Sequence, residues 1–490
     1  MNNKKLVTNS ILYVINNILT KAFQFFLVPI YTAYLTTAEY GTSNLISNFI
    51  AIGSVLISLS IGSATAKFFS ELQNDEEKSR RLFGSLYLFV VFCGLISCAV
   101  VYCFGNVISE HVFGGVPFYP TIAAVIVSLW VQGIADQYKG MLQARQEAKI
   151  YTFVSLLGFC LQLGLNIVLI IYFGMGVFGI VLSTIIANIV IIAVSLVDIF
   201  RRRLIAWTVD FSIVKDALKY SVPLVPHNLS STIAQFLSRV FIGKSHSLSA
   251  IGIYGLAGQF GHIVDTVQNS VQAAYLPWFF EQMNVSKENA IKRVKEAIPM
   301  LLNVYNVFFL GVMLFSQEAI KLVASESYFE AWKLIPLFVV EYAIKTPYYF
   351  YVSFLFHDRE RAKFIFVASF SGNMVNIILA AILVPVMGMY GALAADAVAI
   401  CLQLSIVIWL CKGENKPYFR YPIFLKSVIP LVILGGIGLV PSYMMPNNGY
   451  SYWLILYKAV IWLCFTAFIL KKYAPEVQAM IKNMKERGKK

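Results

Sequence analysis

Residues 6–45 read LVTNSILYVINNILTKAFQFFLVPIYTAYLTTAEYGTSNL and begin with a long run of mostly apolar side chains. The part from 8 to 31 exceeds the roughly 20 residues that an α-helix needs to cross the hydrocarbon core of a bilayer. The apolar run continues past Pro29 without a small-residue cleavage site, so we predict a retained first transmembrane helix and no secretory signal.

The rest of the chain repeats this pattern. Of the 490 residues, 58% are hydrophobic and 13% are charged, and the mean hydropathy is +0.71, which no soluble domain could bury. We therefore predict an all-α integral membrane protein with about fourteen spans. They lie near 8–31, 42–66, 83–104, 118–142, 150–173, 177–200, 222–243, 252–280, 297–316, 333–356, 364–386, 388–411, 425–446 and 451–470.

The basic residues predict the orientation of these spans. With the N-terminus inside, most of the 39 Lys and Arg residues fall on the inner side, including the Arg201–Arg203 cluster and the tail. Under the positive-inside rule both termini are cytoplasmic. The net charge of +14 therefore reflects membrane topology and contact with anionic headgroups, and we expect no nucleic-acid partner. The four outer-side bases are Lys244, Lys321, Lys333 and Lys458.

The sequence offers no sign of a metal site or an external domain. The seven cysteines lie in or beside apolar runs without metal-ligand spacing, and we interpret them as small hydrophobic residues. The longest outer loop spans roughly 105–117, so any function must lie within the helices.

Two short motifs recur at nearly the same spacing along the chain. Glu39-Tyr40-Gly41 after the first span matches Ile253-Tyr254-Gly255 after the seventh, and Gly176-Val177-Phe178-Gly179 matches Gly388-Met389-Tyr390-Gly391. An Asn-Ile dipeptide, at 166 and at 376, precedes each of the latter turns. Six spans per unit predict a parallel repeat of two lobes around a central cavity, with two additional C-terminal spans.

The opening stretch, the paired Gly-x-aromatic-Gly turns, the length and the 6 + 6 + 2 span count together resemble the polysaccharide transport family of oligosaccharide flippases. This family belongs to the superfamily that also holds multidrug exporters and the lipid II flippase. The resemblance implies two six-helix lobes in a V and alternating access. It also implies transfer of an undecaprenyl-pyrophosphate-linked oligosaccharide repeat unit, such as O-antigen or capsule, from the cytoplasmic to the outer leaflet of the bacterial inner membrane.

Under this interpretation the chain divides into a first lobe, a linker, a second lobe and two further parts. Partners are then the lipid-linked substrate, membrane lipids, and a polymerase or other assembly proteins, with the chain itself a monomer. The expected boundaries are 1–200 and 222–411 for the lobes, 201–221 for the cytoplasmic linker, 412–470 for the two additional helices and 471–490 for the basic tail.

Ionisable residues inside a membrane are costly and are therefore functional candidates. A pyrophosphate and its sugars need cations and hydrogen-bond partners in a wet cleft, which points to Lys21, Arg239 and Lys345 as substrate-binding cations. Lys139 lies near the inner end of its span and can snorkel to the headgroups.

The intramembrane acids leave two interpretations open. Glu341 and Lys345, and likewise Asp136 and Lys139, stand at helical spacing and can neutralise each other. Alternatively the acids line a polar cavity or bind a coupling proton or sodium ion, for which Asp265 and Asp396 are the candidates; we expect no other cofactor. The polar set that we assign to cavity or coupling roles is Asp265, Asp396, Glu341, His262 and Gln24.

Aromatic and proline residues complete the candidates. Tyr348, Tyr349 and Tyr351 follow Lys345 and are candidates for stacking on sugar faces, although Tyr is common at membrane interfaces. Prolines within spans are candidate hinges. They are Pro29, Pro223, Pro226, Pro277, Pro347 and Pro385.

Four rival interpretations have to be compared with this one. A multidrug exporter shares the fold but usually has twelve spans, and the lipid II flippase differs mainly in its cargo. A polytopic enzyme would need a large outer loop or an acidic motif in the first one, and the chain has no GxxxxGK[ST] for nucleotide hydrolysis. A non-catalytic scaffold does not account for the intramembrane charges.

Overall fold

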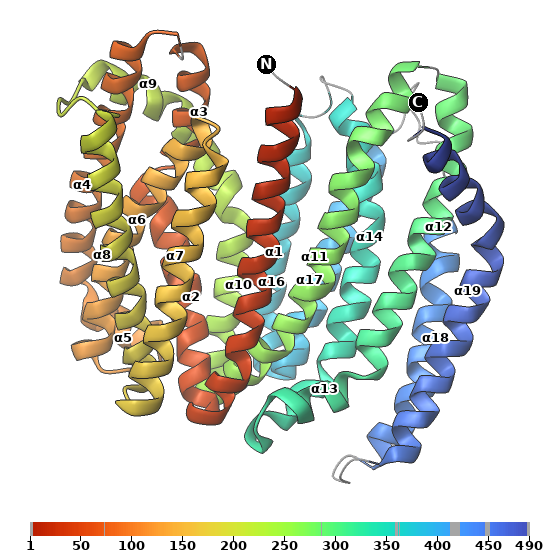
Figure 1. Cartoon of the computed structure of the whole chain (residues 1–490). Coiled ribbons are helices and arrows are strands. Elements are labelled where there is room, and N and C mark those ends of the chain that lie inside the picture. The colour runs from red at the N-terminus through yellow and green to blue at the C-terminus, as the bar shows by residue number, and fades with distance from the viewer. Residues whose placement is uncertain are drawn as a thin grey trace. The chain divides into compact units, whose positions relative to one another are not determined.

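A computed structural model describes residues 3–72, 74–285, 287–357, 361, 363–411, 422–445 and 451–487. Over these residues the chain is helical, with no strand (Figure 1). It divides into two compact units, which are described separately. The first holds residues 1–253 and 380–389, and the second holds 254–379 and 390–490.

The first unit contains seven long helices, which lie at the first seven predicted spans, and six shorter elements. They are α1 (Asn3–Tyr34), α2 (Thr37–Ser58), α3 (Ile61–Leu72), α4 (Glu76–Cys103), α5 (Gly105–His111), η1 (Phe118–Ile122), α6 (Ala123–Ala144), α7 (Ala148–Ile167), η2 (Val168–Tyr172), α8 (Gly176–Arg202), α9 (Phe211–Ser221), η3 (Val222–Leu224) and α10 (Val225–Ser245).

The second unit contains most of the remaining helices. The start of α11 and the last turns of α16 belong to the first unit. The elements are α11 (Leu248–Val285), α12 (Lys287–Leu314), α13 (Ser316–Val323), η4 (Glu326–Lys333), α14 (Ile335–His357), α16 (Ile365–Met387), α17 (Met389–Leu410), α18 (Pro422–Met444) and α19 (Tyr452–Arg487).

Long helices overlap all fourteen predicted segments. Ten helices among the described residues are long and apolar enough to cross a membrane, so the chain is a multi-pass membrane protein. The division at residues 253 and 254 assigns α10 to the first unit, whereas the sequence places the start of the second lobe at 222. The lobe boundaries at 200 and 222 stay a prediction.

The repeated motifs begin helices. Glu39-Tyr40-Gly41 lies in the first turns of α2, where the Thr36 hydroxyl accepts the Glu39 N–H (3.2 Å) and the Glu39 carboxylate accepts the Thr36 N–H (2.8 Å). This capping box starts a helix where the sequence suggests a turn. Gly176 is the first residue of α8, and Gly388 stands directly before α17. Both glycines have a positive φ, of +51° and +60°. The two Gly-x-aromatic-Gly turns therefore share a backbone conformation that favours glycine.

The repeated asparagines also occupy similar places. Asn166 of α7 donates to the Tyr31 hydroxyl (2.9 Å) and accepts from Ser183 of α8 (2.5 Å). Asn376 of α16 donates to the Asp396 carboxylate of α17 (2.9 Å). In each half, the asparagine therefore links the helix before the glycine turn to the helix after it.

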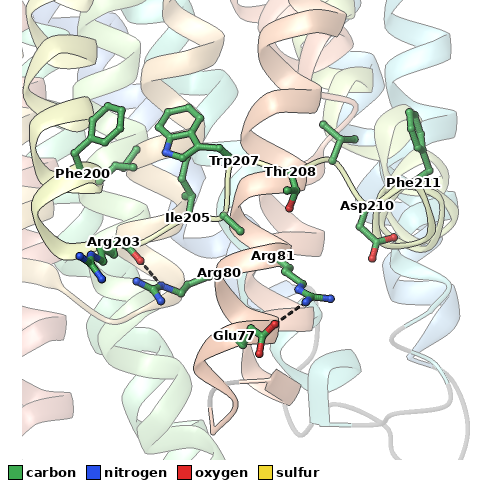
Figure 2. A pocket seen from close by; sticks show the side chains of 13 residues that line it. Glu77, Arg80, Arg81, Phe200, Arg203, Ile205, Trp207, Thr208, Asp210 and Phe211 are labelled. Atoms are coloured by element: carbon green, nitrogen blue, oxygen red, sulfur yellow. Dashed lines mark hydrogen bonds and ion pairs between the residues drawn. The ribbon is translucent and has the colours of Figure 1, made fainter.

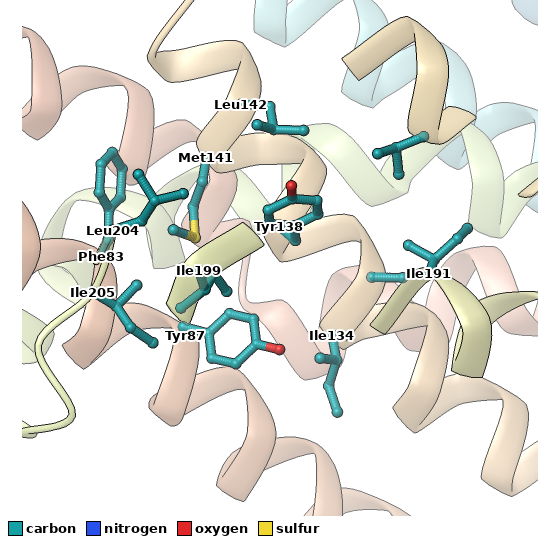
Figure 3. Packing of buried hydrophobic residues seen from close by; sticks show 12 residues of the cluster. Phe83, Tyr87, Ile134, Tyr138, Met141, Leu142, Ile191, Ile199, Leu204 and Ile205 are labelled. Atoms are coloured by element: carbon teal, nitrogen blue, oxygen red, sulfur yellow. The ribbon is translucent and has the colours of Figure 1, made fainter. Parts of the chain in front are cut away.

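The core of the first unit lies among α4, α6, α7 and α8 (Figure 3). Its buried side chains are mostly large aliphatic and aromatic residues, and Tyr138 adds one polar contact by donating to Asp198 (2.9 Å). The cluster consists of Phe83, Tyr87, Ile134, Ala135, Tyr138, Met141, Leu142, Val154, Ile191, Ile199, Leu204 and Ile205.

Two glycines allow α2 to approach the start of α11 closely. A Cβ atom on Gly41 would lie 2.0 Å from the Leu248 carbonyl oxygen, and one on Gly252 would lie 2.1 Å from that of Thr37. Any larger side chain at either position would force the two backbones apart. Small residues at such crossings let membrane helices associate by van der Waals contact.

The last two long helices pack on α12 of the second unit (Figure 1). Asn306 donates to the Ser427 hydroxyl of α18 (2.6 Å), and Trp462 of α19 donates to the Val307 carbonyl (2.8 Å). These polar contacts attach α18 and α19 to one helix of the unit.

Candidate functional site

The carboxylate of Asp265, in the middle of α11, forms the centre of a polar cluster in the second unit. Its Oδ1 atom lies 3.1 Å from the Lys345 ammonium group and 2.9 Å from the Tyr349 hydroxyl, both on α14. Its Oδ2 atom accepts from Asn269, one turn further along α11 (2.9 Å). The side chains of Lys345 and Asp265 keep 30% and 22% of their surface exposed, so the pair is accessible from one side.

Aromatic rings flank the Lys345 ammonium group. It lies 5.3 Å from the ring centre of Tyr342 and 5.4 Å from that of Tyr349, within the range of cation–π attraction. Because residues 342, 345 and 349 share one face of a helix, α14 by itself positions both rings beside the cation. The cluster therefore presents a cation, a carboxylate, a phenol and an amide together.

Two glutamines hold α11 against α14 beside this cluster. Gln268 donates to the Tyr342 carbonyl (2.8 Å) and the Thr346 hydroxyl (2.7 Å). Gln272 donates to the Tyr349 carbonyl (3.0 Å) and the Ser353 hydroxyl (2.6 Å). The polar residues of α11 therefore have two different roles. The two glutamines connect α11 to α14, while Asp265 and Asn269 belong to the charged cluster.

Glu341 takes part in a second acidic contact. It is buried, 6% exposed, and its carboxyl is hydrogen-bonded to that of Asp396, which also accepts from Asn376. Glu341 Oε2 has no hydrogen-bond partner among the described residues. Two ionised carboxyl groups in contact would repel each other strongly, so this contact is a candidate site for a shared proton or a bound cation.

The sequence suggests two ion pairs within single helices, and the structure contains one of them. Asp136 and Lys139 do form an ion pair (3.2 Å), with Asp136 half exposed. Lys345, however, forms its ion pair with Asp265, and the hydrogen-bond partner of Glu341 is Asp396. The proposed Glu341–Lys345 pair on one helix face is not the pair that forms, because tertiary packing brings a closer carboxylate from α11.

The remaining predicted cations lie in the first unit. Arg239 is buried in α10, 8% exposed, and its Nη1 donates to the Gln235 carbonyl one turn earlier (3.0 Å). Lys21 and Gln24 are on α1, but their side chains lie outside the described residues. His262 is exposed on α11, one turn before Asp265.

The predicted aromatic and proline residues differ in their surroundings. Tyr349 belongs to the Asp265 cluster, whereas Tyr351 is 3% exposed and packs against Phe424, so it is a core residue. Pro223 lies in η3 and Pro226 at the start of α10, where the missing N–H costs no helical hydrogen bond. Four prolines do lie inside helices, at Pro29, Pro277, Pro347 and Pro385.

One buried ion pair was not predicted from the sequence. Lys458 of α19 is fully buried, and its ammonium group lies 2.7 Å and 2.9 Å from the two carboxylate oxygens of Glu318 on α13. Charge counting places Lys458 on the outer side of the membrane, yet the structure places it inside a helix contact. The two residues are 140 positions apart, so no local spacing signals the pair.

The many long apolar helices, with charged clusters between them, define a multi-pass membrane protein. Residues 32–333 match the family described as polysaccharide biosynthesis protein, and the chain belongs to that family.

Two curated proteins are similar to most of this chain. Protein 1 of the Lsg locus of Haemophilus influenzae is 19% identical over 72% of this chain and 85% of its own length. An uncharacterized membrane protein of the same organism is 21% identical over 75% of this chain and 87% of its own length.

The fold is that of known transporters. The lipid II flippase MurJ in an inward closed conformation matches with a TM-score of 0.71 at 14% identity, covering 95% of this chain and all of that one. An inward-facing multidrug resistance MATE transporter of the MOP superfamily matches at 0.62 and 14% identity, covering 84% and 95%. The all-helical transporter fold predicted from the sequence is therefore confirmed, while the count of fourteen spans is not established.

Proposed function

We propose that this chain is a flippase that moves an undecaprenyl-pyrophosphate-linked oligosaccharide from the cytoplasmic to the outer leaflet of the bacterial inner membrane. Membership of a polysaccharide biosynthesis family carries the proposal, and the transporter fold supports it. In this proposal the chain works as a monomer by alternating access, with both termini cytoplasmic, and a polymerase consumes its product.

Lys345 is the proposed contact for the pyrophosphate in the second unit. In the resting state its charge is compensated by Asp265, so the ammonium group is held ready without an unpaired buried charge. A pyrophosphate oxygen takes the place of the Asp265 carboxylate, and Tyr349 offers its hydroxyl and its ring to phosphate or sugar. Lys21 and Arg239 are the proposed cations of the first unit.

The acidic residues are the proposed ion-coupling groups. Glu341 and Asp396 share a proton or sodium ion, and the unpartnered Glu341 Oε2 supports this role. Occupation of this pair changes the net charge near the Asp265–Lys345 pair, because Glu341 and Lys345 lie one turn apart on α14. A coupling ion thereby has a way to affect the hold on Lys345. His262 and Gln24 are proposed as further polar groups.

Deletion of the gene tests the flippase proposal. Without the protein, lipid-linked repeat units should accumulate in the inner leaflet, and a membrane-impermeant lectin should label fewer of them on the outer face of spheroplasts. Normal labelling, in a strain that has no second carrier for this substrate, would contradict the proposal.

Two alternatives rest on the fold similarity: a lipid II flippase and a cation-coupled multidrug exporter. The first predicts that expression of this chain rescues cells depleted of their own lipid II flippase. The second predicts that deletion increases susceptibility to cationic drugs. Loss of surface polysaccharide with neither of these effects would support the oligosaccharide cargo.

A further inference from the structure

The segment between α8 and α9 is held in an extended form along the start of α4. The Ala206 N–H donates to the Arg80 carbonyl (2.9 Å), and the Asp210 N–H donates to the buried Ser85 hydroxyl (2.9 Å). A Cβ atom on Gly84 would lie 1.8 Å from the Ala206 carbonyl oxygen. The segment can lie this close to α4 only because residue 84 is glycine.

Apolar contacts and a helix cap fix both ends of this segment. Leu204 and Ile205 are 4% and 6% exposed and belong to the core cluster of the first unit (Figure 3). The Asp210 carboxylate accepts the Ser212 N–H (2.9 Å) and so caps α9. The backbone of residues 203–210 is therefore a firm support for the side chains that it carries.

The segment, the start of α4 and the end of α8 enclose a pocket of about 830 Å³ (Figure 2). This volume is within the range of small-molecule sites. Five of the thirteen lining residues are charged, three of them arginines, and seven are apolar. It comprises Glu77, Arg80, Arg81, Ile199, Phe200, Arg203, Ile205, Ala206, Trp207, Thr208, Val209, Asp210 and Phe211.

Three guanidinium groups lie in a row along one edge of the pocket (Figure 2). Arg81 is paired with Glu77 (2.6 Å). The Nε atom of Arg80 donates to the Arg203 carbonyl and lies 3.9 Å from the Glu76 carboxylate, while its two Nη groups make no hydrogen bond with the described residues. The guanidinium of Arg203 makes no ion pair or hydrogen bond with the described residues. The lining holds three arginines against the carboxylates of Glu77 and Asp210, so it carries one more positive than negative charge.

The pocket lies where apolar spans end. The candidate span of α8 ends at Arg202 and the helix of α4 begins at Glu76, so we expect the pocket at the level of the lipid headgroups. The rings of Phe200 and Trp207 stack at 5.1 Å, and Trp207 is 47% exposed. Phe211, at the start of α9, is 80% exposed. Exposed aromatic rings beside basic residues are typical of surfaces that lie in the membrane interface.

We propose that this pocket binds the phosphate headgroup of an anionic phospholipid. Arg203 and the free Nη groups of Arg80 hold the phosphodiester, and the rings of Phe200 and Trp207 lie against the glycerol and the first methylenes. Arginine suits this role because its planar fork donates two hydrogen bonds to one phosphate. The site is independent of the transport cluster in the second unit and of the proposed cargo.

The test uses the purified full-length chain in a non-ionic detergent, with lipid retention measured by native mass spectrometry. Phosphatidylglycerol should be retained about tenfold more tightly than phosphatidylcholine, and free glycerol phosphate should compete only weakly. R203Q should weaken phosphatidylglycerol retention about five- to tenfold, the value of one charge-assisted hydrogen bond, while R203K loses less.

R201Q provides the matched control, because Arg201 is exposed in the last turn of α8, carries the same charge and does not line the pocket. It should leave retention unchanged. Equal losses in R201Q and R203Q would reduce the effect to general surface charge and overturn the proposal. Equal retention of the two lipids, or full competition by glycerol phosphate, would also overturn it.

Discussion

The ammonium group of Lys345 lies 3.1 Å from the Oδ1 atom of Asp265, although the two residues are 80 positions apart and an acid stands one turn before the lysine on its own helix. Packing of α11 on α14, through Gln268 and Gln272, brings the two charges together. The pairing leaves Glu341 to contact Asp396. The Lys345–Asp265 contact therefore decides the partners of both Asp265 and Glu341, and variants of Lys345 and Asp265 test the proposed transport role.

Loss of the Lys345 charge should reduce transport. We expect K345A to lower the rate of substrate flipping by about tenfold or more, because one charge-assisted hydrogen bond to the substrate is lost. The measurement is outer-leaflet labelling of lipid-linked oligosaccharide at equal protein abundance in the membrane. K139A removes a lysine from an ion pair outside this cluster and should leave flipping unchanged. If K345A were as active as K139A, Lys345 would not contact the substrate.

The pair of Lys345 and Asp265 should behave as one unit. D265N leaves the lysine charge uncompensated, so we expect it to reduce flipping as well, and D265N/K345Q should cost less than the sum of the single changes. A double-mutant cycle on flipping rates and protein abundance measures this coupling. Strictly additive effects would show that the ion pair has no role in transport.

The Glu341–Asp396 contact predicts a response to ion gradients. E341Q keeps the shape of the side chain but removes its charge and its ability to release a proton. We expect it to abolish any stimulation of transport by an imposed proton or sodium gradient in proteoliposomes, without lowering protein abundance. E330Q alters an exposed glutamate of η4 and should respond as the unmodified chain does. An unchanged gradient response in E341Q would remove this contact from ion coupling.

The buried pair of Lys458 and Glu318 should stabilise the attachment of α19 to α13. K458M leaves the Glu318 carboxylate, 16% exposed, without its partner, and breaking such a pair costs about 3–5 kcal/mol. We expect a lower thermal unfolding temperature in detergent. K458M/E318L removes both charges and should recover most of the loss. A double variant as unstable as K458M would mean that packing of the lysine stem, and not its charge, supplies the stability.

The contact of Gly41 and Gly252 should tolerate no side chain. G41A or G252A places a methyl group within about 2 Å of a carbonyl oxygen, and we expect destabilisation of about 1–3 kcal/mol from overpacking. G62A is the control, because a Cβ atom there meets nothing within 4 Å. The midpoint of thermal unfolding measures all three, and a neutral G41A would show that α2 and α11 can separate without cost.

Several short elements escaped prediction for a common reason. Helices α3, α5, α9 and α13 are too short to span a membrane, and a search for long apolar runs passes over them. Residues 203–210, expected as part of a simple linker, form a pocket only because Gly84 and Ser85 of α4 hold them. The sequence feature that permits this pocket is Gly84, but its contact, Ala206, lies more than a hundred residues further along the chain, so local patterns do not reveal it.

The sequence by itself determined that the long helices of this protein lie in a lipid bilayer, where these helices are along the chain, and where the glycine turns of its repeat fall. These properties follow from local composition, because a bilayer requires about 20 apolar residues in a row and a positive φ favours glycine at that residue. The tertiary structure alone decided which charges meet: Lys345 with Asp265, Glu341 with Asp396, and Lys458 with Glu318. Each partner comes from another helix, and an ion pair forms with the carboxylate that packing brings nearest.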